Sequence, residues 1–493
     1  MKKINIENLI ITLLILIVPI TIYGNLFEND LFFDIKTGES ILKYGIDFKD
    51  HFSFHHNLIY LYHHWLYDLI IFFIYKIFNY NGIRIFFVLI SSLFGFIYFN
   101  ALNKYSPNKI FSAIITLFIL IITNYAFQSR VQSITYILFF LEIIYLNKLY
   151  AQGKKKDIFI LSTISILILN LHMPLWILFV ILLLPYLFEA TLYLIHNRKS
   201  ELKKESLIEK TKNYKITIIC FLIILFTGLI TPLKLNSYTF FIKVLKSNSY
   251  SFISEMQKTI LFYHYWVWII LLIFIILTYS KLLRIKIRDF MLVIGLFVFS
   301  LLANRNVIYF LIVCPFIIIK SIEYEKISNT NLIKKIKCML NNSHKTIIKI
   351  FSIVFISIIY IFNIKINFIN ITKKINDAYP DKTVLYIKKN LDYKNIKQYN
   401  DFNYGSYLEF YNIPVFIDSR AEVYVKNFNG GKDIVSDYLK TNDMKSYKEV
   451  FKKYKFNYAI VETNSNINYY LSINTNWKLI FKEKGFRLYK KIQ

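Results

Sequence analysis

Long apolar runs recur along the 493-residue chain and are separated by short clusters rich in lysine and arginine. With flanking residues and some tilt, these runs are long enough to cross about 30 Å of hydrocarbon. Examples are Leu9–Tyr23, Ile110–Ile122, Ile216–Leu229 and Trp266–Leu277. Soluble enzymes contain far fewer such runs. The pattern therefore predicts an α-helical polytopic membrane protein.

The segment Trp65–Phe78, WLYDLIIFFIYKIF, is ambiguous, because it is shorter than the ~20 residues of a span and contains Asp68 and Lys76. If it spanned, the basic loops at 147–157 and 196–213 would lie outside, against the positive-inside rule. As an amphipathic interfacial helix, it leaves every strongly basic loop on the cytoplasmic side. We therefore predict about eleven spans with a cytoplasmic amino terminus: 9–24, 82–101, 109–126, 131–148, 157–172, 175–195, 214–232, 265–280, 289–304, 306–322 and 346–364.

The pattern changes after the last predicted span. Residues 1–366 form the predicted transmembrane domain, whose first outer loop, 24–81, carries interfacial helices, and residues 367–493 form a small extracytoplasmic α/β domain. In that domain IPVFIDSR and FNYAIVE are typical of buried strands, and SYKEVFKKYK is typical of a helix. The stretch WKLIFKEKGFRLYKK predicts a hairpin that turns near Gly485.

Composition narrows the functional classes. The net charge is +29, and the lysines and arginines lie in clusters between the apolar runs rather than along one basic face. This distribution indicates a role in membrane topology rather than nucleic-acid binding. The three cysteines are far apart and have no metal-like spacing. No glycine-rich phosphate loop is present, which argues against nucleotide-driven transport and a nucleotide-sugar donor. Met1–Tyr23 has the basic start and apolar core of a signal peptide but no small-residue cleavage site follows, so we expect a retained helix.

The first outer loop is the acidic part of the chain. Asp30 and Asp34 are four residues apart, so a helix that begins near Asn29 would place both on one face. A carboxylate held near lipid by aromatic neighbours has a raised proton affinity, which suits a general base. For other acids of this loop, such as Glu39 and Asp47, a solvated surface position is the simpler interpretation.

Further polar residues gather at the predicted outer face. Charged or amide groups at membrane depth are site candidates by default, although snorkelling or helix capping explains them equally well. The candidates are Arg130, Asn170, His172 and Arg305 at the outer ends of spans, His63 and His64 in the first loop, and Glu255 in the loop 231–264. The two arginines could grip a phosphate, whereas Glu255 could instead pair with Lys258 at the surface. Asp418 and Arg420, at the end of a predicted strand, could pair with each other or face the membrane site.

Several blocks resemble one known family. ENDLFFDIKTGE, GIDFKDHFSF and YHHWL are similar to the opening of a bacterial branch of the GT-C superfamily, polytopic glycosyltransferases that use lipid-phosphate sugars, with approximate patterns D-x-D-L-W-W-H-L-R-T-G-E, D-P-F-S and H-E-W-L. SRVQS, LNLHMP, NDFNYGSYL and VFIDSRAEVY resemble later blocks of the same branch. The resemblance covers scattered blocks from about residue 28 to 493.

The departures from the family pattern are specific. Glu28 stands where the family has Asp, Asp34 where it usually has His, His64 where it has Glu, Phe32 and Phe33 where it has Trp, and Val131 where it has Pro. The change at Glu28 keeps the charge. The change at His64 removes an acid, and Asp34 offers a carboxylate nearby in its place.

The resemblance implies a transferase of the bacterial plasma membrane, with the carboxyl-terminal domain outside. It would move a sugar, with inversion, from a polyprenyl-phosphate donor to a glycan, lipid or protein of the cell envelope. The nominated residues are Asp30, Asp34 and Asp50 for catalysis, Arg130, Arg305, His63, Asn170 and His172 for the donor phosphate, and Glu255, Asp418 and Arg420 for the acceptor side. No cofactor is identified, and a divalent metal is left open. The alternative is a non-catalytic, GT-C-like translocase of lipid-linked glycans, or an envelope assembly factor.

Overall fold

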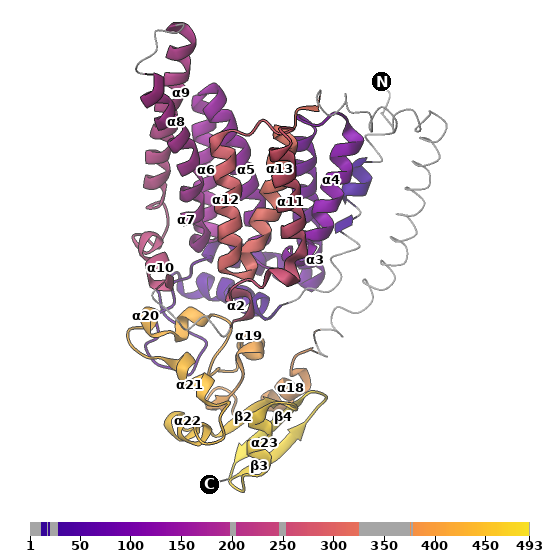
Figure 1. Ribbon diagram of the computed structural model, residues 1–493. Coiled ribbons are helices and arrows are strands. Elements are labelled where there is room, and N and C mark those ends of the chain that lie inside the picture. Colours follow the sequence, from indigo (N-terminus) through magenta and orange to yellow (C-terminus); the bar gives the residue numbers. More distant parts are fainter. Residues whose placement is uncertain are drawn as a thin grey trace, which may run out of the picture.

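A computed structural model describes residues 11–16, 18–19, 28–197, 204–245, 253–324, 375 and 378–492. Most of these residues form a bundle of helices, with the carboxyl-terminal segment at one end of it (Figure 1). The bundle and its connections comprise α3 (Trp65–Leu102), α4 (Lys109–Ile122), η1 (Asn124–Ala126), α5 (Gln132–Gln152), α6 (Lys155–Leu171), α7 (Met173–Leu182), α8 (Leu184–Asn197), α9 (Lys204–Thr227), α10 (Asn236–Leu245), η3 (Ser254–Met256), η4 (Leu261–His264), α11 (Tyr265–Tyr279), α12 (Ile287–Leu302), η5 (Asn304–Asn306) and α13 (Val307–Ser321).

Five helical stretches among the described residues are long and apolar enough to cross a membrane. They are Trp65–Leu102, Gln132–Gln152, Met173–Tyr193, Phe262–Tyr279 and Asn304–Ser321. The chain is thus a mostly helical, membrane-type protein with a small carboxyl-terminal sheet. The finer prediction of eleven spans is not shown: α4, α6 and α12 are shorter helices. The predicted span 346–364 and half of the span 9–24 lie outside the described residues.

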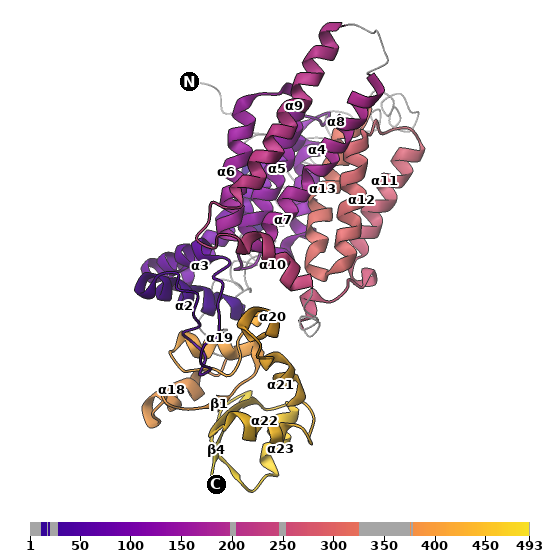
Figure 2. The same cartoon turned by 90° about the vertical axis from the view of Figure 1, so that its left-hand side faces the viewer.

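The long helix α3 breaks where the charge pattern requires a break. Asn79 has φ 53° and ψ −154°, so the helical geometry stops there and restarts. The part before the break lies across the end of the bundle, and the part after it runs into the bundle (Figure 2). A separate helix over 65–78 is therefore present, as the sequence predicts.

Helix α2 (Asn29–Tyr44) lies against this first part of α3. The two backbones come close at Gly38, where a Cβ atom would clash with the carbonyl oxygen of Asp68. Only glycine permits this approach. The helix begins at Asn29, as predicted from the spacing of Asp30 and Asp34.

The carboxyl-terminal segment combines short helices with one small sheet. Its elements are α18 (Asp381–Asn390), β1 (Gln398–Tyr399), α19 (Phe402–Phe410), η6 (Ala421–Tyr424), α20 (Lys426–Asn429), α21 (Ile434–Lys440), α22 (Tyr447–Tyr454), β2 (Tyr458–Glu462), α23 (Asn466–Ser472), β3 (Trp477–Lys482) and β4 (Phe486–Lys491). The sheet order is β1-β2-β4-β3, with β1 parallel to β2 and the other pairs antiparallel. The predicted strand in FNYAIVE, the helix in SYKEVFKKYK and the hairpin at Gly485 are confirmed.

The predicted strand in IPVFIDSR is wrong as a strand of this sheet. Its residues are buried, but the backbone of Val415 pairs with the segment between α2 and α3 instead, through a parallel bridge to Ser53. Phe54 N–H donates to the Val415 carbonyl at 3.1 Å, and Val415 N–H donates to the Phe52 carbonyl at 3.2 Å. The apolar pattern predicted burial correctly, while a distant part of the chain supplies the hydrogen-bonding partner.

Aromatic packing adds a second contact between α2 and the carboxyl-terminal segment. The ring of Phe32 is fully buried and meets the rings of Tyr379 and Tyr407 edge-on, each at 4.9 Å between centroids. The Asn29 amide donates to the Phe402 carbonyl at 3.0 Å. Helix α2 therefore lies between the bundle and the carboxyl-terminal segment (Figure 2). The predicted domain boundary at 366/367 falls outside the described residues.

Candidate functional site

One guanidinium group gathers acids from two separate segments, and we call Arg130, Glu28, Asp30 and Glu255 the Arg130 cluster. Arg130 lies in the turn before α5, Glu28 and Asp30 lie at the start of α2, and Glu255 lies in η3. Arg130 Nε is 3.4 Å from Asp30 Oδ2, and the guanidinium also makes direct contacts with Glu28 and Glu255. The exposed fractions of these four side chains lie between 22% and 32%, so the cluster is partly exposed.

The charges of the Arg130 cluster are unbalanced. Burial raises the pKa of Glu28 to about 7, with a further contribution from the Asp30 and Glu255 charges, while Arg130 opposes the shift. Burial alone would lower the pKa of Arg130, but Asp30, Glu255 and Glu28 raise it. Since three acids face one cation, a proton on Glu28 near neutral pH relieves part of the repulsion.

A second group of acids lies deeper, one helical turn along α2. Asp34, His64 and Asp68, the Asp34 cluster, are all buried. His64 Nδ1 is 3.1 Å from Asp68 Oδ1 and 3.8 Å from Asp34 Oδ1. Burial raises the pKa of Asp34, and the neighbouring Asp68 carboxyl raises it further. One imidazole and two carboxylates form a donor set of the kind that holds divalent metals.

The remaining predicted donor residues surround the Asp34 cluster. The rings of His63 and His64 are 4.0 Å apart, and those of His64 and His172 are 6.5 Å apart. Among the described residues Arg305 makes no ion pair, so its charge is available to a ligand.

The side-chain amide of Asn170 already has hydrogen-bonding partners at both its oxygen and its nitrogen. Its carbonyl oxygen accepts the Trp65 indole N–H at 3.1 Å, and its amide donates to the Ile230 carbonyl at 2.9 Å. These contacts join α6, the start of α3 and the end of α9. The predicted contact between Asn170 and a donor phosphate would therefore have to replace one of them.

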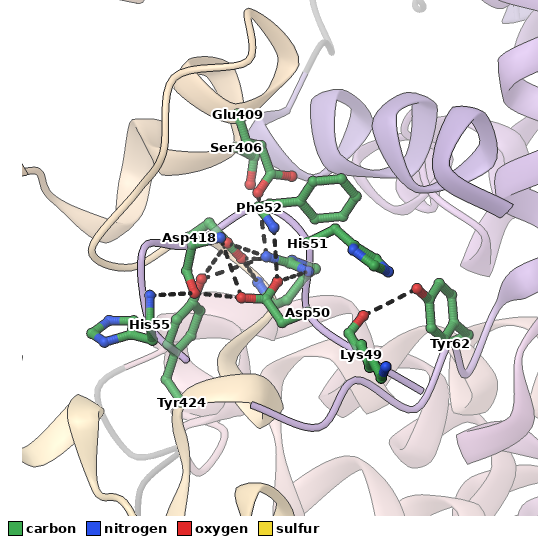
Figure 3. Close-up of polar contacts among 12 residues, drawn as sticks. Lys49, Asp50, His51, Phe52, His55, Tyr62, Ser406, Glu409, Asp418 and Tyr424 are labelled. Carbon is green, nitrogen blue, oxygen red and sulfur yellow. Dashed lines mark hydrogen bonds and ion pairs between the residues drawn. The ribbon is translucent and has the colours of Figure 1, made fainter. Parts of the chain in front are cut away.

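The third group, the Arg420 cluster, comprises Arg420, Asp50, Asp418 and Glu409. Arg420 pairs with Asp50 at 2.9 Å, with Asp418 at 2.6 Å and with Glu409 at 3.4 Å, and all four side chains are fully buried. Figure 3 shows Asp50 and Asp418 pointing toward one another, with Tyr424, whose hydroxyl donates to Asp418, beside them.

Arg420 is also packed between aromatic rings, at 4.7 Å from the Phe52 centroid and 4.9 Å from that of Tyr60. Burial works against the charge on Asp418, but Arg420 outweighs it and holds the pKa of Asp418 below its usual range. Burial and the Asp418 charge raise the pKa of Glu409. The cluster thus joins the segment around Asp50 to the carboxyl-terminal segment through ion pairs that are closed to solvent.

The structure separates the nominated residues into groups. Asp30, Arg130 and Glu255 come together, whereas Asp50, Asp418 and Arg420 form a different, sealed cluster. The interpretation in which Asp418 pairs with Arg420 is confirmed, and Glu255 pairs with Arg130 rather than with Lys258.

Sequence reasoning missed two acids. Glu28 lies two residues before Asp30 in the same acidic stretch, so a signal for it existed in the sequence. Glu409 has no such signal in its local sequence. It lies next to Arg420 because α19 packs closely against the segment at Ile417, where a Cβ on Gly405 would clash with the Ile417 carbonyl. Comparison with known proteins finds no family model and no curated protein that matches this chain.

Proposed function

We propose that this chain is a membrane glycosyltransferase that moves a sugar from a polyprenyl-phosphate donor to a glycan, lipid or protein acceptor on the outer face. The observation that carries the proposal is the separation of 3.4 Å between Asp30 and Arg130. A base and a phosphate-binding cation must lie within one ligand's length to act on the same donor. This pair meets that condition at the partly exposed end of the bundle. Because an inverting transfer has the base and the leaving phosphate on opposite faces of the sugar, the ion pair opens as the donor and acceptor bind between the two groups.

Asp30 accepts the proton of the acceptor hydroxyl as its oxygen bonds to the anomeric carbon of the sugar. The bond from that carbon to the phosphate oxygen breaks on the opposite side, and the lipid phosphate leaves with the electron pair. Inversion at the anomeric carbon follows from this in-line geometry. Positioned proton transfer of this kind contributes about 10²–10⁴ in rate.

Arg130 stabilises the leaving phosphate through charge-assisted hydrogen bonds. The phosphate takes the place of carboxylates that contact the guanidinium in the free protein. Glu28 is the first to yield, because its pKa of about 7 allows it to take a proton instead of holding the cation.

Arg305 supplies a second cation, which makes no ion pair with the part of the chain that the structure describes. Its turn, η5, contacts the segment that carries Glu255: Asn304 N–H donates to the Gln257 carbonyl and the Asn304 amide donates to the Ser254 carbonyl, both at 3.1 Å. An anion at the Arg130 cluster would therefore lie beside the segment of Arg305.

The crowding of Arg130 favours one alternative. A guanidinium that keeps all three carboxylates has no capacity for a phosphate, and a GT-C-like fold of that kind would act as a translocase of lipid-linked glycans or an assembly factor. The two functions leave different products in the membrane, so one experiment distinguishes them.

The test compares Asp30→Asn with Glu39→Gln, a matched control on the same helix whose side chain pairs with Lys36. Lipid-linked sugars and surface glycans are measured by mass spectrometry in cells that carry each variant. We expect Asp30→Asn to insert and fold, to accumulate the lipid-linked sugar and to leave the glycan one residue short, while Glu39→Gln behaves as wild type. Near-normal transfer by Asp30→Asn would discard the mechanism. Accumulation of a complete lipid-linked glycan would establish the translocase.

A further inference from the structure

The Asp34 cluster holds two carboxyl groups and one imidazole in a site that is closed to solvent. Asp34 comes from α2, His64 is the residue before α3, and Asp68 lies in the first turn of α3. We propose that Asp34, His64 and Asp68 together bind one divalent transition-metal ion.

The geometry fits a single ion. One ligand atom from each residue lies within 4.8 Å of the other two. Ligand atoms held about 2.0–2.2 Å from one metal ion are themselves separated by roughly 3–4.4 Å, so a small closure of the site suffices. Gly38 permits this closeness, because any larger residue there would push α2 away from Asp68.

The carboxyl groups of Asp34 and Asp68 face each other and His64. Only 3% of Asp34 is exposed, and its side chain lies 3.8 Å from His64 Nδ1 and next to the Asp68 carboxyl. Asp68 is fully buried, and its Oδ2 has no hydrogen-bond donor among the described residues. The two carboxyl groups are within hydrogen-bonding reach of one another. Two buried acids in contact need either a shared proton or a cation between them.

The donor set favours a cation of a particular class. A neutral imidazole beside two carboxylates suits Mn²⁺, Fe²⁺ or Zn²⁺, whereas Mg²⁺ and Ca²⁺ prefer oxygen alone. His64 Nδ1 already points toward both acids, at 3.1 and 3.8 Å. This is the orientation that the three side chains need to bind the same metal ion. The site is one helical turn from Asp30, so the ion adds positive charge beneath the Arg130 cluster.

The test measures bound metal, so it stands apart from any transfer activity. Full-length protein in detergent micelles is stripped with EDTA, incubated with MnCl₂ or ZnCl₂, desalted and analysed by inductively coupled plasma mass spectrometry. We expect about one ion per chain for wild type and for Glu39→Gln, and at least a tenfold lower content for Asp34→Asn. Wild type that keeps no ion, or an Asp34→Asn variant that keeps as much as wild type, would overturn the proposal.

A second measurement needs no variant, in case Asp34→Asn fails to fold. X-ray absorption spectroscopy of zinc-loaded wild type should show nitrogen and oxygen ligands only, including one imidazole. Thiolate ligands, or the absence of an imidazole, would refute the assignment, because the cluster contains His64 and no cysteine.

Discussion

Two arginines in this chain each meet three carboxylates, yet their surroundings differ. Arg420 and its acids are fully buried and come from the first outer loop and the carboxyl-terminal segment. Arg130 and its acids are partly exposed and lie at the end of the bundle. The same chemical groups are therefore sealed in one place and accessible in the other.

The difference separates a structural role from a ligand-binding role. A buried charge cluster is stable only as a complete set, since the loss of one member leaves the others without solvent or partner. A partly exposed cluster can exchange a carboxylate for another anion, because water and protons relieve the change. We therefore propose that Arg420 docks the carboxyl-terminal segment and that Arg130 binds the donor phosphate.

The largest effect is expected when Arg420 is removed. Arg420→Met leaves Asp50, Asp418 and Glu409 buried without a cation, which should lower the free energy of unfolding by about 3–5 kcal/mol. Thermal unfolding in detergent measures the loss, and limited proteolysis should detect release of the carboxyl-terminal segment. Glu409→Gln is the control: since burial already favours the protonated acid, it should cost less than ~1 kcal/mol. Equal stability of Arg420→Met and wild type would contradict the docking role.

Removal of Arg130 should instead reduce transfer strongly and change the stability little. Arg130→Gln should reduce transfer at least ~100-fold, because the leaving phosphate loses its charge-assisted hydrogen bonds. The free energy of unfolding should change by less than about 1 kcal/mol, since the freed acids can be solvated. Transfer assays and thermal unfolding are run on the same preparation. A variant that unfolds as readily as Arg420→Met would remove the distinction between the two clusters.

Local patterns predicted the elements well. The spacing of Asp30 and Asp34 predicted a helix from Asn29, and the placement of basic loops predicted the break that the structure has at Asn79. Both depend on periodicity and charge within one segment. The prediction that IPVFIDSR is a strand of the sheet was wrong. Its backbone partner is the segment near Ser53, which is far away in sequence, so no local pattern could indicate the pairing.

The grouping of the site residues was less predictable. Asp50 and Arg420 are each recognisable as unusual in the sequence, but nothing in their local pattern says that they pair. Charge alone also does not distinguish Asp30, which remains accessible, from Asp34, which α3 covers. The deciding contacts are tertiary, through Gly38 and Gly405, where two backbones come close.

A fall in pH should destabilise the region of the Arg420 cluster through protonation of His55. Burial lowers the pKa of His55 to about 4 while its ring contacts the Phe416 carbonyl at 2.8 Å, and Asp50, Asp418 and Lys432 surround it. Because the unfolded His55 takes a proton at about 6.5, the stability that it contributes is present above that pH. It is lost as the pH falls toward 4, by roughly 1–3 kcal/mol.

His55→Gln keeps a neutral donor and should remove this part of the pH dependence. Unfolding of wild type and variant is compared at pH 7, 5.5 and 4.5, so that the opposing contributions of raised-pKa acids cancel. Parallel curves for the two proteins would exclude His55 as the titrating group.

The smallest effect concerns Glu28, the acid that competes with the donor. Its pKa of about 7 means that the folded protein binds a proton more tightly than the unfolded chain, so its contribution to stability is present below about 4.5 and is lost as the pH rises through 7. Above pH 7 the charged Glu28 also opposes a phosphate at Arg130. Glu28→Gln should therefore lower the KM for the donor about two- to fivefold at pH 8 and leave it nearly unchanged at pH 6, whereas Glu39→Gln should match wild type at both. A KM ratio that stays the same at the two pH values would show that Glu28 does not compete for Arg130, and the accessible cluster would then bind its ligand without exchanging this acid.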